Sequence, residues 1–311
     1  MERFHRLAAR IARPWVAAAV AGLLALAFVL LLPSGEDAAA HLYQTQRWKD
    51  WGWQFWDNFW YAGRYSQINY SLLYYPLAAI FGTATIVAAS VGGAAAAFSR
   101  IIHRRWLAVA TWPSVAFAFL APLPVLTGTY PFLLGLALGL AALVALQAGR
   151  RKLTVVLAAL VAVAHLLALL LLITALIGIA AATPRWWKRH GIRTLAFGLA
   201  VVVGAAALLW RAFSTPGGEY PFDVLDLVVV LAFCTAGWLL ARGRPDLRVL
   251  LGIFGVYALL AVTAFAISSP IGANVGRLLL FMGAPLLLVP LAARGFRPRG
   301  LTVALLAGAL L

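Results

Sequence analysis

Two adjacent acids and a histidine follow the first apolar run of the chain. Glu36 and Asp37 come directly after a Pro-Ser-Gly turn, and His41 stands four residues beyond Asp37. If a helix begins here, Asp37 and His41 share one of its faces. A carboxylate at this place can act as a general base toward a hydroxyl group, and together with a histidine it can hold a divalent cation. The structural alternative is that Asp37 caps the helix.

A second group of residues suits an anion. Arg277 opens the last full apolar run, after Gly272 and Gly276, two glycines that allow close backbone approach. A helix start offers free N–H groups and partial positive charge, so an arginine there can receive a phosphate. Arg64, a cation of the first polar loop, can clamp a phosphate as well. The alternatives are that these arginines reach lipid headgroups, or that Arg64 pairs with Asp57.

Three further ionisable residues are candidates for substrate contacts. Glu219 and Asp223 belong to a second acidic, turn-rich segment at 215–226, and acids of two loops on one side of a membrane can converge on one site. His165 interrupts an otherwise apolar run. A lone histidine in such a run is commonly a hydrogen-bonded structural residue, but at a turn it can also line a cavity.

The elements that position these residues follow from composition. Of 311 residues, 64% are hydrophobic and 11% charged, and the mean hydropathy is +0.94. A soluble domain is about half apolar and about a quarter charged, so a soluble fold is excluded. We predict one integral membrane domain over 1–311, an all-α polytopic bundle with about 10 to 11 membrane helices at ~20 residues each. Cys234 is the single cysteine, which excludes disulfides and Cys-based metal centres within the chain.

The predicted spans divide the charges between two sides. The spans are 14–32, 73–98, 106–126, 130–148, 153–166, 168–183, 194–213, 225–241, 249–268, 278–293 and a last run from 301. With the N-terminus inside, 20 of the 25 basic residues fall on the inner side, in segments 1–13, 99–105, 147–152, 184–193, 241–248 and 294–300. This distribution predicts a multi-pass protein of the plasma membrane with a cytoplasmic N-terminus.

Most of the acids fall on the other side. Seven of the nine are outer in this topology: Glu36, Asp37, Asp50, Asp57, Glu219, Asp223 and Asp226. The positive-inside rule makes no demand on acids. The presence of most acids on one side therefore needs another reason, and a functional role of these acids on the outer face is one.

Two features of the apolar runs bear on the architecture. The run 153–183 has basic clusters at both ends, so it must cross the membrane an even number of times, and we predict two short helices that turn near His165. Such a turn at membrane depth requires cover by protein or a water-filled cavity. The run from 301 is still apolar at 311, and we expect the natural protein to continue beyond it.

The first outer loop, 33–72, is the one long polar interruption and is rich in tryptophan and tyrosine. Trp48, Trp51, Phe55 and Phe59 recur at helical spacing, with Arg47, Asp50, Gln54 and Asp57 on the opposite side. This pattern predicts an amphipathic interfacial helix lying flat on the membrane surface. Its aromatic residues serve either as anchors or as stacking partners for a sugar or a lipid-linked substrate, and their spacing does not separate the two.

These residues together resemble the GT-C superfamily of integral-membrane glycosyltransferases. The resemblance rests on Gly35-Glu36-Asp37-Ala38-Ala39-Ala40-His41 after the first span, the loop helix, Tyr74-Tyr75-Pro76 before the second span, the hairpin at 153–183 and the acidic segment at 215–226. It extends over about residues 14–293, and it is greatest for bacterial polyprenyl-phosphate-sugar-dependent enzymes, including actinobacterial arabinofuranosyltransferases.

The resemblance implies transfer of a sugar from a lipid-phosphate donor to a glycan or lipid acceptor of the cell envelope on the outer face. It places the catalytic acid at Asp37, with Glu36 beside it, and the phosphate-binding cation at Arg277 or Arg64. Many relatives have Asp-Asp or Asp-Glu where this chain has Glu36-Asp37, so either carboxylate can be the one that acts. Two other classes remain open, a transporter or flippase and a non-catalytic membrane subunit. The apolar spans offer few ionisable residues for transport, and no feature indicates a nucleic-acid partner.

Overall fold

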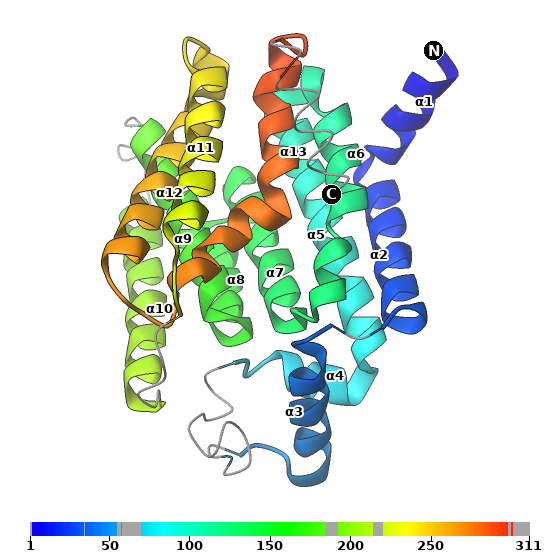
Figure 1. Ribbon diagram of the computed structural model, residues 1–311, viewed down its shortest axis with the longest axis vertical. Helices are drawn as coiled ribbons and strands as arrows, with labels where there is room; N and C mark the ends of the chain where they lie inside the picture. The colour runs from blue at the N-terminus through cyan, green and yellow to red at the C-terminus, as the bar shows by residue number, and fades with distance from the viewer. Residues whose placement is uncertain are drawn as a thin grey trace.

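The protein is a bundle of helices (Figure 1). The computed structural model describes residues 2–33, 35–54, 57, 70–183, 192–213, 220–297 and 300. The described residues form α-helices and short 3-10 helices and contain no strand. The all-α, polytopic fold expected from the composition is confirmed.

The α-helices follow the alanine- and leucine-rich runs. Their bounds are α1 Glu2–Ile11, α2 Pro14–Leu31, α3 Ala38–Trp51, α4 Tyr74–Phe81, α5 Thr83–Trp106, α6 Thr111–Leu120, α7 Tyr130–Gln147, α8 Arg151–Ala164, α9 Leu166–Ala182, α10 Ile192–Phe213, α11 Val224–Ala241, α12 Arg248–Ala266 and α13 Arg277–Ala293. Four 3-10 segments join them: η3 Leu107–Val109, η4 Leu123–Thr127, η6 Pro245–Leu247 and η7 Gly272–Gly276.

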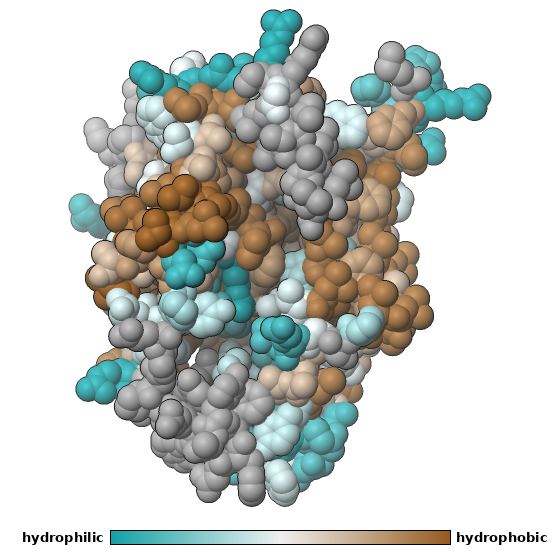
Figure 2. Space-filling view, viewed as in Figure 1, coloured by the Kyte–Doolittle hydropathy of each residue, from teal (hydrophilic) through white to brown (hydrophobic). Residues whose placement is uncertain are grey.

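Seven helical stretches of the described residues are long and apolar enough to cross a membrane: Pro14–Leu31, Thr83–Val109, Tyr130–Gln147, Ile192–Arg211, Val224–Ala241, Pro245–Ala266 and Gly272–Ala293. Two shorter apolar stretches, Thr111–Thr127 and Leu166–Ala182, lie among them. Figure 2 shows broad apolar areas on this face of the molecule, with hydrophilic side chains at the upper end, near the middle and toward the lower end. The chain is therefore a multi-pass membrane protein.

The predicted helical hairpin in the apolar run 153–183 is confirmed. His165 has extended backbone angles, φ −167° and ψ 120°, and separates α8 from α9. The carbonyl of Val163 accepts hydrogen bonds from the N–H groups of Leu72 and Leu73 at 2.8 and 3.1 Å, so this turn lies beside the first loop. Helix α9 then returns along α12, where a Cβ on Gly178 would lie 2.7 Å from Ile253 Cα.

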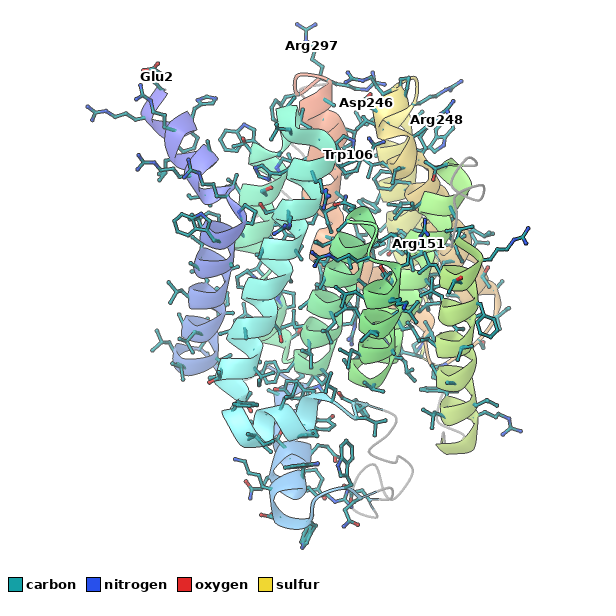
Figure 3. The ribbon with its side chains drawn as sticks, turned by 180° about the vertical axis from the view of Figure 1, so that it is seen from behind. Glu2, Trp106, Arg151, Asp246, Arg248 and Arg297 are labelled. Atoms are coloured by element: carbon teal, nitrogen blue, oxygen red, sulfur yellow. The ribbon has the colours of Figure 1, made fainter. Side chains whose placement is uncertain are left out.

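The two ends of the bundle differ in charge. Figure 3 shows Glu2, Asp246, Arg248 and Arg297 at one end, which we call the basic end, while Arg151 lies further toward the middle. There the indole N–H of Trp106 donates to the carbonyl of Asp246 at 2.9 Å, which ties α5 to η6, just before α12. The opposite end carries α3 and α4 and is called the loop end (Figure 1).

The interfacial helix of the first loop differs from its prediction. Helix α3 ends at Trp51, before Gly52 with φ 67°, and it projects beyond the bundle roughly along the direction of the spans (Figures 1 and 3). Arg47 of α3 and Asp57, which lies beyond the end of the helix, are buried and form an ion pair at 3.2 Å, instead of facing water. Asp57 folds back onto α3 and covers Arg47, whereas Asp50 of the same polar stripe stays exposed.

The predicted span 73–98 is also broken. Gly82, with φ 85°, separates α4 from α5. Since that conformation disfavours residues with a Cβ, the chain turns here and lays the short helix α4 against α3. This turn places Tyr74 and Tyr75 near the first turn of α3, where both are fully buried.

Candidate functional site

The tight turn before α7 fixes the backbone of Asp37. The N–H of Asp37 donates to the carbonyl of Thr127 at 3.2 Å. Gly128 has φ +81°, and a Cβ on it would lie 2.3 Å from the nitrogen of Ala38, so a glycine is required at this position. The side chain of Asp37 is exposed and makes no capping hydrogen bond to α3. Its carboxylate is thus available to other groups, and capping does not account for it.

His41 lies in a cage of four tyrosines. Its side chain is buried, its Nδ1 lies 3.1 Å from the hydroxyl of Tyr75, and its ring centroid lies 5.9 to 6.2 Å from those of the four rings. We call this group the tyrosine cage: Tyr70, Tyr74, Tyr75 and Tyr130. Three of these residues come from the first loop and α4, and Tyr130 begins α7. The cage therefore joins α3 to the spans.

The His41–Tyr75 pair is uncharged at neutral pH. Burial, and secondly the charge of Arg277, lower the pKa of His41 to about 3. Burial also raises the pKa of Tyr75 well above its usual value, so the phenol keeps its proton. His41 is consequently no cation for an anionic ligand.

The depressed pKa of His41 predicts a pH dependence of stability. Unfolded His41 binds a proton below about pH 6.5, whereas folded His41 does so only near pH 3. Between these values the unfolded state binds more protons, so the free energy of unfolding falls as the pH falls, by up to about 1.4 kcal/mol per pH unit. We expect His41→Gln to have a smaller drop in Tm than the wild type between pH 7 and pH 4.5, measured by thermal unfolding in detergent.

Tyr75→Phe is the control for this experiment, because it removes the hydrogen bond and leaves His41 buried. It should keep the slope of the wild type. Equal slopes in His41→Gln and the wild type would contradict the assignment.

Arg277 supplies the positive charge at the loop end. It follows η7, which is held by a 2.8 Å hydrogen bond from the hydroxyl of Tyr257 to the carbonyl of Val275. Its guanidinium carbon lies 5.4 Å from the centroid of the Phe132 ring, a cation–π contact that orients the side chain. Arg277 is partly buried and interacts electrostatically with Asp37 and Tyr70. The carboxylate and the guanidinium predicted as candidates are thus neighbours.

His165 reaches the same place from the helical hairpin. Its ring packs edge-on against Phe132 at 5.4 Å, and it interacts electrostatically with Arg277 and His41. Within the described residues, its buried Nδ1 has no hydrogen-bond partner. A buried polar atom without a partner costs ~1–3 kcal/mol, which is a reason to expect a ligand there.

The second acidic segment contributes a tyrosine to the site. The N–H of Tyr220 donates to the carbonyl of Ser269 at 3.2 Å, and Tyr220 interacts electrostatically with Arg277. Gly272 packs against the carbonyl of Tyr220 too closely for any Cβ. Asp223 is exposed and precedes the first residue of α11, and no contact joins it to Asp37.

Of the remaining predicted site residues, the structure describes Glu36 alone. Glu36 is exposed beside Asp37. Arg64 and Glu219 lie outside the described residues, as does the apolar run from 301. Among the described residues, no cluster of three or more histidine, cysteine, aspartate or glutamate side chains is arranged to hold a metal ion.

An apolar pocket adjoins the site. It lies between α8, the start of α9 and α10, and has a volume of about 200 Å³. Its lining comprises Tyr70, Leu72, Ala159, Ala162, Val163, Leu166, Val201, Val202, Ala205, Ala206, Leu209 and Trp210. Tyr70 thus belongs both to the pocket and to the tyrosine cage, and Leu166 follows His165 directly. The polar site and the apolar pocket are neighbours.

Comparison of the chain with protein-family models, with curated proteins and with solved structures found no match. The function must therefore be argued from the site.

Sequence reasoning missed Tyr70 and Tyr130 as parts of the site. Tyr130 ends a proline-rich turn without charged residues, which indicates a structural element and nothing more. The one signal for Tyr70 is the density of tyrosines at the end of the first loop, and that density is equally typical of membrane anchoring.

The arrangement offers three distinct properties within one region. Asp37 supplies an exposed carboxylate, Arg277 a partly buried guanidinium, and the α8–α10 pocket an apolar surface. A guanidinium binds phosphate oxygens, a carboxylate accepts a proton from a hydroxyl group, and an apolar surface holds a hydrocarbon chain.

Proposed function

We propose that this protein is a membrane glycosyltransferase that moves a sugar from a polyprenyl-phosphate donor to a hydroxyl acceptor at the loop end of the bundle. One observation carries the proposal, namely the position of Tyr70. It lines the apolar pocket, its ring lies 5.9 Å from that of His41, and it interacts electrostatically with Arg277. Tyr70 thus borders both the apolar pocket and the surroundings of Arg277. A ligand whose apolar chain lies in the pocket would therefore have its phosphate near Arg277.

The reaction assigns one task to each group. The hydroxyl oxygen of the acceptor attacks the anomeric carbon, and the bond from that carbon to the phosphate oxygen breaks. Asp37 takes the proton of the hydroxyl, as a general base. Arg277 stabilises the negative charge of the leaving polyprenyl phosphate, and the sugar passes to the acceptor.

His165 is a candidate for contact with the donor. Its Nδ1 is buried without a partner among the described residues, and its ring and the guanidinium of Arg277 both contact the ring of Phe132. A hydroxyl of the sugar or a phosphate oxygen would satisfy it. The tyrosine cage offers flat rings for a sugar, and it also anchors α3.

The direct test is transfer by the purified full chain in lipid nanodiscs. The probe is a polyprenyl-phosphate arabinofuranose with a labelled sugar, and the products are released polyprenyl phosphate and labelled acceptor. We expect both products to form in equal amounts. Movement of intact donor between leaflets of a vesicle, without either product, would favour a flippase and contradict the proposal.

The pocket predicts a dependence on the donor chain. Ala205→Trp fills the α8–α10 pocket, and we expect it to raise KM at least about tenfold for a long-chain donor, because burial of each CH₂ contributes ~0.8 kcal/mol. A donor with a very short chain should be affected little. Steady-state kinetics with the two donors measures the difference.

Leu208→Trp is the matched control, since Leu208 is on the same helix, is 73% exposed and does not line the pocket. It should behave as the wild type with both donors. Equal KM values for Ala205→Trp and Leu208→Trp would show that this pocket does not hold the chain.

A further inference from the structure

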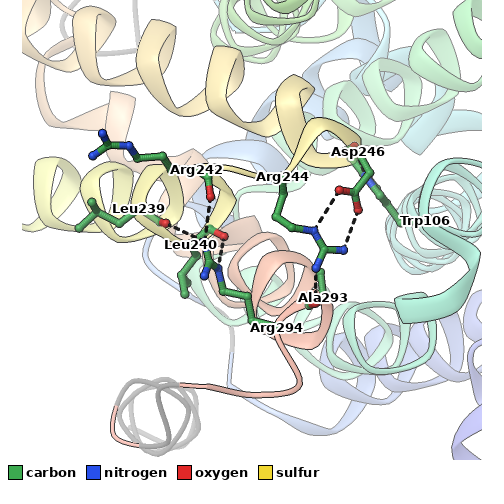
Figure 4. Close-up of polar contacts among 8 residues, drawn as sticks. All are labelled: Trp106, Leu239, Leu240, Arg242, Arg244, Asp246, Ala293 and Arg294. Atoms are coloured by element: carbon green, nitrogen blue, oxygen red, sulfur yellow. Dashed lines mark hydrogen bonds and ion pairs between the residues drawn. The ribbon is translucent and has the colours of Figure 1, made fainter.

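The ends of α11 and α13 are joined by two arginines at the basic end (Figure 4). Arg294, just after α13, donates from Nε to the carbonyl of Leu240 at 2.6 Å and from Nη2 to that of Arg242 at 2.8 Å. Arg244, just after α11, donates from Nη1 to the carbonyl of Ala293 at 2.8 Å. Each helix thus has its last carbonyls bound by an arginine of the other, and the two guanidinium groups are held in place.

A pocket of about 840 Å³ opens between these two helix ends. Its lining combines three arginines with an apolar wall: Arg244, Arg294, Arg297, Ala236, Leu239, Leu240 and Ala293. Leu239 is 53% exposed on this wall. The pocket is therefore cationic at the end of the bundle and apolar along the span.

The positive charge of the pocket is only partly compensated. Asp246 is the only acid near the pocket to form an ion pair in the described part of the chain, and it binds Arg244 at 3.1 Å. The hydrogen bonds of Arg294 all go to backbone carbonyls, and Arg297 is exposed. The partial negative charges of two helix ends amount to about one elementary charge, which leaves the pocket positive.

A neighbouring tryptophan indicates the level of the pocket in the membrane. The guanidinium carbon of Arg242 lies 5.3 Å from the ring centroid of Trp238, and Trp238 is 40% exposed. Tryptophan favours the level of the lipid headgroups. The arginines of the pocket follow Trp238 toward the end of the bundle and thus lie at the headgroup level, whereas Ala236, two residues before Trp238, lies deeper in the span.

We infer that this pocket binds one anionic phospholipid, with its phosphate and headgroup among Arg244, Arg294 and Arg297 and an acyl chain against Ala236 and Leu239. The charge favours an anionic over a zwitterionic lipid, and the apolar wall favours a lipid over a soluble phosphate. Basic pockets between membrane helices are suited to such headgroups. The site is at the opposite end of the bundle from Asp37.

The test uses the purified full chain in mild detergent, with phosphatidylglycerol, phosphatidylcholine or glycerol 3-phosphate added. Native mass spectrometry counts the retained lipids, and thermal unfolding measures the protection. We expect one phosphatidylglycerol to be retained at least about fivefold more than phosphatidylcholine, with a saturable rise in Tm. Glycerol 3-phosphate should give no such rise.

Two variants change the pocket while sparing the arginine caps. Arg297→Gln removes an exposed charge, and Ala236→Phe fills the apolar part without any change of charge. Both should lower the retention of phosphatidylglycerol at least about threefold. Arg248→Gln is the control, because Arg248 is exposed at the same end and does not line the pocket.

Several results would overturn the inference. These are equal retention of the two lipids, wild-type retention in both pocket variants, or an equal loss in Arg248→Gln, which would indicate general attraction to a basic surface. Protection by glycerol 3-phosphate equal to that by phosphatidylglycerol would reduce the site to one for small anions.

Discussion

Replacement of Asp37 by asparagine is expected to lower sugar transfer at least about 100-fold, the effect of removing a general base. Asparagine has nearly the same shape and cannot take the proton of the acceptor hydroxyl. Asp37 is exposed and makes no side-chain cap to α3, so its Tm should remain that of the wild type. Release of polyprenyl phosphate by purified Asp37→Asn in nanodiscs, at saturating donor and acceptor, measures the effect on kcat.

The matched control is Glu36→Gln, since Glu36 is the adjacent carboxylate and is also exposed. Asp37 interacts electrostatically with Arg277, whereas no such contact is found for Glu36. We therefore expect Glu36→Gln to retain transfer within about threefold of the wild type, because Glu36 has no interaction with Arg277 and an exposed substitution of this kind changes stability little. Full activity in Asp37→Asn, or an equal loss in both variants, would contradict the assignment of the base to Asp37.

The spans are the part of the fold that the sequence predicts best. Each long apolar run must become a helix, because the bilayer leaves no other partner for backbone N–H and C=O groups. The turn at His165 follows from the basic clusters at both ends of 153–183, which require a return to the same side. Its break between α8 and α9 agrees with that expectation.

In the first loop, the residue pattern predicts a helix but does not predict what covers its polar face. Polar residues at helical spacing opposite tryptophan and phenylalanine are typical of a surface helix with its polar face in water; here they are Arg47, Asp50, Gln54 and Asp57. Asp57 instead lies buried against Arg47, within 3.3 Å of the hydroxyl of Tyr43. An amphipathic pattern does not show whether lipid, water or another part of the chain covers each face.

The site is assembled from positions far apart in the chain, and periodicity carries no signal for such contacts. The turn at Thr127 places Asp37, and Tyr220 packs on Gly272 near Arg277. The candidates Asp37, His41, His165 and Arg277 could be selected as ionisable residues at helix ends. Their proximity required the packing of the helices, and so did the selection of Tyr70 and Tyr130.

Replacement of Arg277 by glutamine is expected to raise KM for the donor at least about tenfold. The reason is the loss of charge-assisted hydrogen bonds to the donor phosphate, each contributing ~1.5–3 kcal/mol, where about 1.4 kcal/mol is tenfold in affinity. The KM for the acceptor should change little, because the proposed mechanism assigns Arg277 to the donor phosphate and not to the acceptor hydroxyl. Steady-state kinetics with each substrate varied in turn separates the two.

A structural role of Arg277 predicts a different result. Arg277 lies over Phe132, so its removal also loses a cation–π contact of ~0.5–2 kcal/mol, which would lower Tm and reduce kcat without selectivity for the donor. Arg277→Lys keeps the charge but not the planar fork, so we expect it to recover part of the affinity for the donor. Asp37 is exposed, and neither variant leaves it as a buried, unpaired charge. An unchanged donor KM in Arg277→Gln would contradict the assignment of the donor phosphate to Arg277. Arg64 is the second predicted cation for this phosphate, so Arg64→Gln would then be the variant expected to raise the donor KM.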